Sequence, residues 1–324
     1  GQNGVAVLAG GQVRLEQGAR ALPNPLYSDQ PAWDLIDLDR YRMVWQQAHG
    51  YFSLNMAASR GCSFRCNWCS KPIWGNQYLQ RGPRDVAAEM AQLKRNVRPD
   101  HVWFADDIFG FRADWVREFA ATLHQCGGVI PFTIQSRADL LSEDMAQALH
   151  AAGCVEVWLG AESGSQKVLD AMNKGTRVAD LLEARARLGR HGIRVGFFIQ
   201  LGYLGEELDD LLATRELLAA ATPDDVGVSV SYPLPGTRFY ETVKQQLGQK
   251  RHWDESNDLD MMFQGTYRSE FYRAFRNLLH RQVDLDRPGA VAAPGARAEL
   301  EQAWRALLER EGAFRTQPLA ALAV

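Results

Sequence analysis

The segment SRGCSFRCNWCS, residues 59–70, decides how the rest of the chain is interpreted. It places Cys62, Cys66 and Cys69 in a C-x3-C-x2-C spacing, directly after an alternating segment, residues 51–58, that predicts a β-strand. Thiolates are soft ligands that suit iron and sulfide, so three of them from one loop can hold three irons of a four-iron cluster. The fourth iron would then have no protein ligand.

This spacing, with Trp68 directly before the last cysteine, resembles the signature of the radical SAM enzymes. In that family the three cysteines hold a 4Fe-4S cluster whose open iron binds the amino and carboxylate groups of S-adenosylmethionine (SAM). The resemblance implies that an electron from the cluster splits SAM to a 5'-deoxyadenosyl radical, which abstracts hydrogen from an organic substrate. The expected cofactors are therefore the 4Fe-4S cluster and SAM.

The alternative is a non-catalytic iron-sulfur or zinc-binding protein on a degenerate barrel. Zinc sites usually combine a C-x2-C pair with a second ligand pair further along the chain. The other two cysteines, Cys126 and Cys154, stand alone, and no H-x3-H follows them. The spacing therefore favours iron-sulfur over zinc.

Composition limits the classes of partner and location. The 324 residues carry a net charge of −3, with 36 basic residues against 39 acidic ones, which argues against a nucleic-acid binder. Five cysteines, three of them within eight residues, suit a reducing compartment, so we expect a cytoplasmic protein. No run of 18 or more apolar residues occurs, and no membrane span is expected.

From residue 51 onward, apolar segments alternate with segments of helical periodicity, which predicts parallel strands joined by right-handed crossovers. The predicted strands are residues 52–57, 101–105, 132–135, 155–159, 195–200 and 226–231. The predicted helices are residues 84–95, 113–126, 142–152, 178–191 and 206–221. Six units are too few for an eight-stranded closed barrel, so the count and the resemblance together indicate a partial (β/α)6 TIM-like barrel over residues 51–245.

The flanking segments differ from the barrel. Residues 246–324 predict a mostly helical C-terminal extension, with amphipathic helices over 269–283 and 296–311. Residues 1–50 predict a linker, and their PAWDLIDLDRY run (residues 31–41) resembles the linker that follows a cobalamin-binding domain in one radical SAM subgroup. The chain starts without Met and contains no D-x-H-x-x-G motif, so we expect that such a domain could precede it, with cobalamin as a possible further cofactor.

Chemistry in a barrel of this kind gathers at the carboxyl ends of the strands. Asp106 follows the second strand in the FADDIF run, residues 104–109, which resembles a motif of the subgroup that lies near SAM. The resemblance implies that Asp106 contacts SAM, and helix capping by Asp107 or Asp114 is the alternative role for an acid here. Arg137 follows the third strand, where the resemblance implies an arginine whose guanidinium forks onto the SAM carboxylate, and a salt bridge to Asp139 or Glu162 is the alternative.

The GAESGS run, residues 160–165, resembles the family's fourth-strand motif. This resemblance implies that Glu162 and Ser163 contact SAM. Ser165 is instead expected to cap the next helix. Gly202 ends the fifth strand in a motif that resembles the family's adenine contact, and Glu206 is expected as a helix N-terminal acid. Gln200 on that strand faces into or out of the barrel according to its register.

Pro235 lies in the PLPGT turn, residues 233–237, after the sixth strand, where the resemblance implies that backbone shapes the adenine side of the pocket. The predicted function is therefore that of a radical SAM enzyme acting on a small-molecule substrate. The subgroup implies methylation or ring formation with cobalamin, and the family implies an electron donor such as flavodoxin or ferredoxin.

Overall fold

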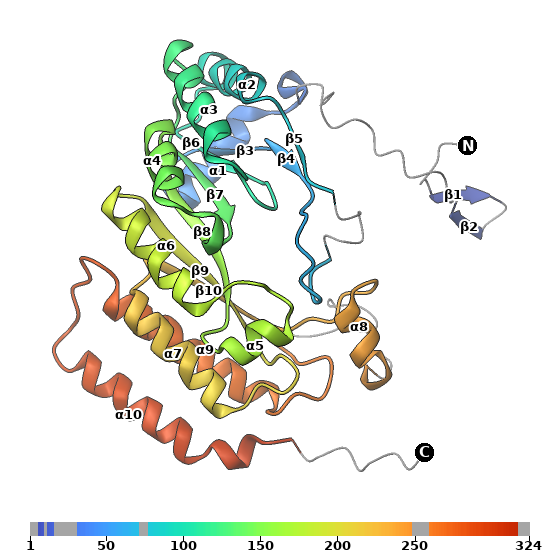
Figure 1. The fold of residues 1–324 in the computed structure, drawn as a ribbon, viewed down its shortest axis with the longest axis vertical. Helices are drawn as coiled ribbons and strands as arrows, with labels where there is room; N and C mark the ends of the chain where they lie inside the picture. The colour runs from blue at the N-terminus through green and yellow to red at the C-terminus, as the bar shows by residue number, and fades with distance from the viewer. Residues whose placement is uncertain (1–5, 10–11, 16–30, 71–76, 248–258, 317–324) are drawn as a thin grey trace.

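A six-stranded parallel sheet forms the centre of the protein (Figure 1). The computed structural model describes residues 6–9, 12–15, 31–70, 77–247 and 259–316. The sheet has the strand order β10-β9-β8-β7-β6-β3. Its strands are β3 (Ser53–Met56), β6 (His101–Phe104), β7 (Phe132–Ser136), β8 (Cys154–Glu162), β9 (Arg194–Leu201) and β10 (Asp225–Val230).

Helices alternate with these strands, as the sequence predicts. They are α2 (Pro83–Asn96), α3 (Ala113–Gln125), α4 (Glu143–Ala152), α6 (Val178–Arg190) and α7 (Leu208–Ala221). Every neighbouring pair in the sheet is parallel, and β3 and β10 form its two edges without pairing with each other. The partial TIM-like barrel is therefore confirmed, and it is open between its first and last strands.

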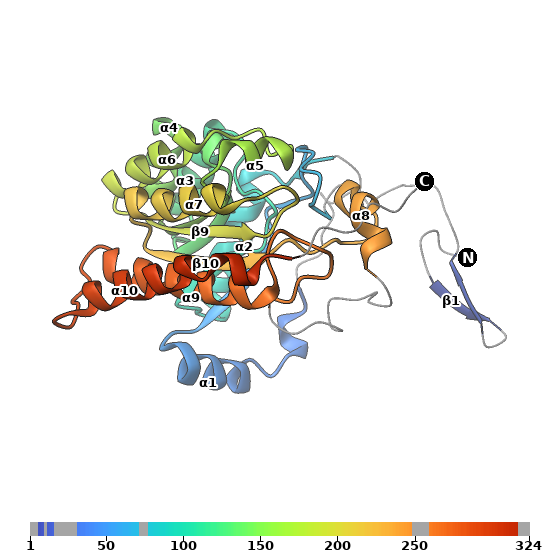
Figure 2. The same cartoon turned by 90° about the horizontal axis from the view of Figure 1, so that it is seen from below.

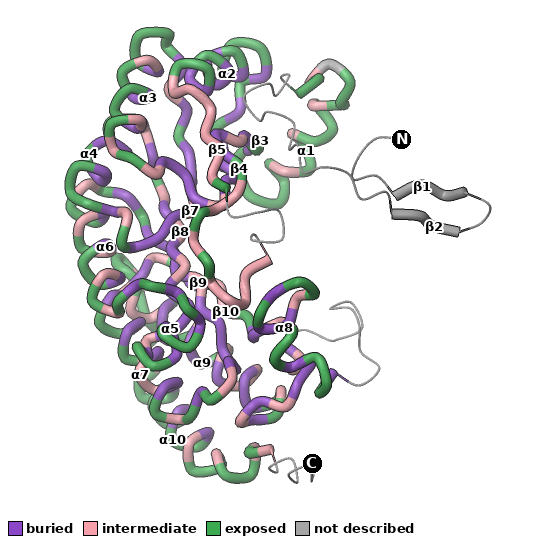
Figure 3. The backbone as a smooth tube through the Cα atoms, turned by 45° about the vertical axis from the view of Figure 1, so that its right-hand side comes forward, coloured by how far each residue is buried: buried purple, intermediate pink, exposed green. Residues whose placement is uncertain are grey.

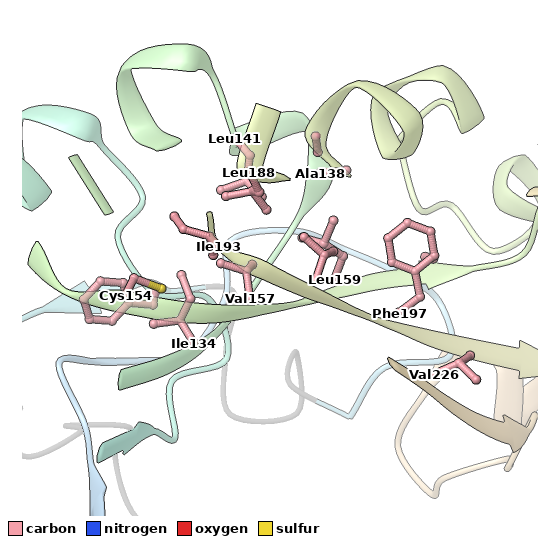
Figure 4. Packing of buried hydrophobic residues seen from close by; sticks show 14 of the residues in the cluster. Ile134, Ala138, Leu141, Cys154, Val157, Leu159, Leu188, Ile193, Phe197 and Val226 are labelled. Atoms are coloured by element: carbon pink, nitrogen blue, oxygen red, sulfur yellow. The ribbon is translucent and has the colours of Figure 1, made fainter. Parts of the chain in front are cut away.

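The outer face of the sheet is apolar and is covered by helices. Figure 3 shows α3, α4, α6 and α7 in an arc on one side of the sheet, with α8 (Arg238–Val243) on the other side. Alternate residues of β8 point to the helices: Val157 and Leu159 are fully buried among Leu188, Ile193 and other apolar side chains (Figure 4). The intervening residues of β8 face the inside of the barrel, because successive side chains of a strand point to opposite faces.

Two further helices flank the edges of the sheet. The sequence did not predict α1 (Leu38–His49), which begins at an Asp37 cap that accepts from the Arg40 amide and ends at Gly50 in the left-handed region. Helix α9 (Ser269–Asp286) packs near β10, and α10 (Ala296–Glu309) packs on α9. In Figure 2, α1 and α9 lie on the opposite side of the sheet from α4 and α6.

The helical character of the C-terminal region is thus confirmed for its described part. Residues 16–30 of the predicted linker, and residues 248–258 and 317–324 of the extension, lie outside the described residues. A short hairpin of β1 (Ala6–Ala9) and β2 (Gln12–Leu15) lies within the predicted linker. Among the described residues, no helix is long and apolar enough to cross a membrane.

Candidate functional site

The cysteine loop leaves the barrel beside β3 and is fixed at its start by a short two-stranded ladder. Strand β4 (Ser59–Arg60) pairs antiparallel with β5 (Leu79–Gln80). The next residue, Gly61, has φ +79°, and a Cβ there would lie 2.2 Å from the backbone oxygen of Gln77. Only glycine fits this turn without moving the backbone, because it combines a left-handed conformation with close packing. The turn delivers Cys62 to the inside of the barrel.

Asn67, between the second and third cysteines, clamps the far end of the loop to three other segments. Its backbone amide donates to the Met172 oxygen at 3.0 Å, and its side chain donates to the Ala171 oxygen at 2.7 Å. The Tyr203 hydroxyl donates to its Oδ1 at 2.8 Å, and the Phe239 amide donates to its backbone oxygen at 3.0 Å. Figure 1 shows the loop running toward α5 (Gln166–Ala171) and α8. The C-x3-C-x2-C spacing alone gave no signal for this residue.

We expect Asn67→Ala to weaken retention of the metal without unfolding the barrel. The change removes two side-chain hydrogen bonds, each worth about 0.5–1.5 kcal/mol, from a loop that otherwise keeps its backbone contacts. Iron bound per chain after reconstitution and desalting should fall by about half or more, with a thermal midpoint within about 4 °C of wild type. The matched control is Asn96→Ala on α2. Equal iron retention in the two variants would contradict the role given to Asn67.

The three thiols line one cavity of about 520 Å³ at the carboxyl ends of the strands. Within the described residues, no three His, Cys, Asp or Glu side chains converge closely enough to bind a single metal ion. Three thiol side chains from one loop are soft sulfur donors of the kind that hold iron-sulfur clusters, so the donor set fits a 4Fe-4S group. Burial raises the pKa of the Cys62 thiol, with an opposing contribution from the Phe64 amide that donates to it.

Arg137 is built into the wall of this cavity beside the thiols. Its guanidinium stacks on the Phe64 ring at 3.6 Å, lies 4.0 Å from Cys66 Sγ and donates to the Lys174 oxygen at 2.9 Å. It also forms a two-bond fork with Asp139, at 3.0 Å for each bond. Arg137 therefore forms the salt bridge to Asp139 that the sequence offered as an alternative. Its guanidinium supplies a fixed positive charge next to the cysteine loop.

Glu162 lies in the same cavity and is paired with a residue that the sequence did not point to. Its carboxylate accepts from Lys174 Nζ at 2.8 Å, and both side chains are nearly buried, at 6% and 7% exposed. Glu162 has φ +61°, a left-handed conformation that is unusual for a residue with a side chain and gathers at functional sites. No motif signals Lys174, which follows α5 and approaches the fourth strand only in the folded chain.

Asp106 does not line the cavity, although its neighbour Asp107 does. Its carboxylate accepts from the Ala58 amide at 2.8 Å and from the Ser59 hydroxyl at 2.5 Å. Burial raises its pKa to about 7, against the lowering effect of these bonds. The structure gives Asp106 an anchoring role at the entrance of the cysteine loop, and its contact with SAM stays a prediction. Neither Asp107 nor Asp114 caps α3, whose N-cap is Arg112.

Three other candidates also lie outside the residues that line the cavity, namely Ser163, Gly202 and Pro235. The Ser163 hydroxyl is fully buried against the Thr214 hydroxyl at 3.2 Å and accepts from the Ser165 amide. Ser165 caps α5 by accepting from the Val168 amide, as expected. Gly202 adopts φ +75°, and a Cβ there would meet Met261 and Tyr272. The structure gives Ser163 and Gly202 packing roles. The predicted cofactor contacts of Ser163, Gly202 and Pro235 stay predictions.

Glu206 is not the helix N-terminal acid that the sequence indicates. It precedes α7, is fully buried, and accepts from the Gly202 amide through Oε2 at 2.5 Å. Burial raises its pKa to about 8, the Gly202 bond opposes this, and Asp210 raises the pKa further against the lowering effect of Lys167. Glu206 therefore carries a proton in the folded protein near neutral pH.

This raised pKa makes stability depend on pH. The folded state binds the Glu206 proton more tightly than the unfolded state, so the stabilisation is complete below the unfolded pKa and is lost as pH rises toward about 8. Wild-type stability should fall by up to about 4 kcal/mol between pH 5 and 8, at about 1.4 kcal/mol per pH unit, and Glu206→Gln should remove this part of the pH dependence. Urea unfolding across this range measures the difference between variant and wild type. Parallel curves would show that Glu206 is ionised when folded.

Comparison with known proteins identifies the family. The profile of the radical SAM superfamily matches residues 56–218, which is half of the chain and includes all three cysteines. This chain belongs to the radical SAM superfamily.

Relatives and a solved structure extend this result. An uncharacterized methyltransferase of Pyrococcus horikoshii is 26% identical over 262 residues, covering 79% of this chain and 55% of the relative. An anaerobic magnesium-protoporphyrin IX monomethyl ester cyclase of Cereibacter sphaeroides is 25% identical over 249 residues, covering 75% of this chain and 40% of the relative. The structure of OxsB, a cobalamin-dependent SAM radical enzyme with aqua-cobalamin and SAM bound, superposes with a TM-score of 0.60 at 17% identity.

The OxsB match covers 95% of this radical SAM chain and 51% of OxsB. The chain thus spans about half the length of the relatives it matches. These comparisons support the radical SAM interpretation over the alternative of a non-catalytic metal-binding barrel.

Proposed function

We propose that this chain binds a 4Fe-4S cluster through Cys62, Cys66 and Cys69 and binds SAM in the adjoining cavity. The observation that carries the proposal is that three thiols from one loop share a cavity with the carboxyl ends of the parallel strands. When bound, the two cofactors supply reductive cleavage of a sulfonium and hence removal of hydrogen from an unactivated carbon. The reaction would be methyl transfer or ring formation on a small organic molecule.

The protein's own groups then have distinct tasks. Arg137 and Lys174 place positive charge beside the thiolates, which offsets part of the negative charge gathered there. The Glu162 carboxylate has an acceptor site besides its bond to Lys174, and this site can take a hydrogen bond from the SAM ammonium. The Phe64 and Trp68 rings line the cavity next to the cysteines and help to exclude water from the reaction.

Cobalamin is part of this proposal because of the subgroup that the chain resembles. OxsB is a cobalamin-dependent enzyme, and about half of its chain has no counterpart here. We propose that cobalamin is supplied by a further domain or a separate protein, since the D-x-H-x-x-G motif is not in these 324 residues. A flavodoxin or ferredoxin would deliver the electron, and a reducing cytoplasm would suit the partly exposed thiols of the cysteine loop.

The test is anaerobic reconstitution with iron and sulfide, followed by incubation with SAM and dithionite. We expect a brown protein that binds about four irons per chain and releases 5'-deoxyadenosine or, with hydroxocobalamin that dithionite reduces to the methyl acceptor cob(I)alamin, S-adenosylhomocysteine. A cluster-loaded protein that leaves SAM intact under both conditions would refute the proposal. The same protein, with and without a cobalamin-binding partner domain, measures the cobalamin requirement.

A further inference from the structure

Two aromatic side chains on neighbouring strands line the same cavity as the thiols. Trp158 on β8 and Phe198 on β9 stack with ring centroids 4.7 Å apart and planes 26° apart. Both line the cavity and are only partly buried, unlike the fully buried aromatic side chains of the core. The indole is held in place because its Nε1 donates to Glu156 at 3.1 Å. An oriented aromatic surface is thus open to the cavity.

Glycines on the neighbouring strands allow these rings to lie flat. Gly196 is the register partner of Trp158, and a Cβ there would lie 2.5 Å from the indole ring. Phe198 has glycine partners on both sides, Gly160 and Gly227, and a Cβ at Gly227 would lie 3.2 Å from its ring. A larger residue at 196 or 227 would force the rings away from the sheet. The glycines therefore keep this wall planar.

Gln200 adds a polar group at one end of this wall. It lies two residues after Phe198, so its side chain faces the same side of β9, and it lines the cavity. The side chain is 6% exposed, and its Oε1 has no hydrogen-bond partner among the residues that the structure describes. A buried carbonyl oxygen without a partner is unfavourable unless a ligand supplies the donor. The register left open by the sequence is thus resolved: Gln200 points inward.

We propose that Trp158, Phe198 and Gln200 form the substrate subsite and that it takes a planar aromatic ring carrying an N–H donor. The ring would stack on the aromatic wall, in the offset or edge-on arrangements that aromatic pairs prefer, and its N–H would donate to Gln200 Oε1. This inference rests on the proposed function, because it takes the cavity beside the thiols as the active site. It adds the chemical class of the substrate.

Indole and 1-methylindole are the probes that test the subsite, because they differ by the single N–H. Their affinities for the reconstituted protein with SAM bound are measured by ligand-observed NMR titration. We expect indole to bind about tenfold more tightly than 1-methylindole. Only indole can donate a hydrogen bond to Gln200 Oε1, which otherwise stays unpaired. Equal affinities, or no binding of either probe, would overturn the inference without any need for a variant.

Variants then assign the effect to residues. Gln200→Leu should remove the discrimination between the two probes, and Phe198→Ala should weaken both of them. The control is Gln147→Leu, an exposed glutamine on α4, which should keep the tenfold discrimination. Discrimination that survives Gln200→Leu in a protein with a wild-type melting temperature would overturn the assignment.

SAM cleavage by the wild-type protein, measured in parallel without probe, separates this inference from the proposed function. Cleavage without probe discrimination would overturn only the subsite. Discrimination by a protein that leaves SAM intact both with and without cobalamin would leave the subsite standing and overturn the proposed function.

Discussion

Replacing Cys62, Cys66 or Cys69 by alanine is expected to abolish the broad absorbance near about 400 nm that thiolate-ligated iron-sulfur clusters give. Each thiol lines the same cavity, and the loop is fixed at both ends, so another side chain has no route to replace the lost ligand. Iron per chain should fall from about four to below about one. Anaerobic reconstitution, desalting and iron and sulfide assays measure this loss.

Cys126→Ala is the matched control for these variants. Cys126 is an exposed thiol at the end of α3, on the helix side of the sheet. Its replacement should leave the absorbance and the iron content at wild-type values. A cluster band that persists in Cys62→Ala, or that disappears in Cys126→Ala, would refute the ligand assignment.

Replacing Lys174 by methionine is expected to lower the free energy of unfolding by about 3–5 kcal/mol, because it leaves the Glu162 carboxylate buried without its partner. The two side chains lie 2.8 Å apart and are almost fully buried. The double variant Glu162→Gln with Lys174→Met should recover a large part of this loss, since it removes both charges. Urea unfolding of the wild type, both single variants and the double variant gives the coupling energy.

The exposed ion pair between Lys244 and Glu241 supplies the control for this cycle. Both side chains are about half exposed, so Lys244→Met should change stability by less than about 1 kcal/mol. An equally small effect of Lys174→Met would contradict the assignment of Glu162 and Lys174 as a buried charge pair that stabilises the fold.

The sequence predicted the barrel well because the strands and helices carry strong periodic patterns. All six predicted strands and all five predicted helices are present, within a few residues of their bounds, whereas the short helix α5 between β8 and β9 was not among the predicted ranges. Helix α1 was missed because none of its side chains is fully buried, and its pattern was read as a linker. Its N-cap at Asp37 and its glycine stop at Gly50 were the available signals.

The site was predicted less completely, because side-chain direction depends on register and on contacts between distant segments. Of two consecutive acids, the sequence favoured Asp106, whereas the end of β6 turns Asp107 into the cavity and Asp106 toward Ala58. Lys174 reaches Glu162 only through the turn after α5, which no local pattern reveals. The cysteines, Arg137 and Glu162 were placed at the cavity because spacing and strand ends fix those positions directly.

The central claim is that the cluster has three protein ligands and an iron that is open to SAM. Electron paramagnetic resonance of the reduced, reconstituted protein tests it directly, with SAM labelled by 15N at its amino group. The account predicts that SAM shifts the g values of the reduced cluster and that the label gives a resolved electron-nuclear coupling. A spectrum that SAM leaves unchanged, with no coupling to the label, would contradict it.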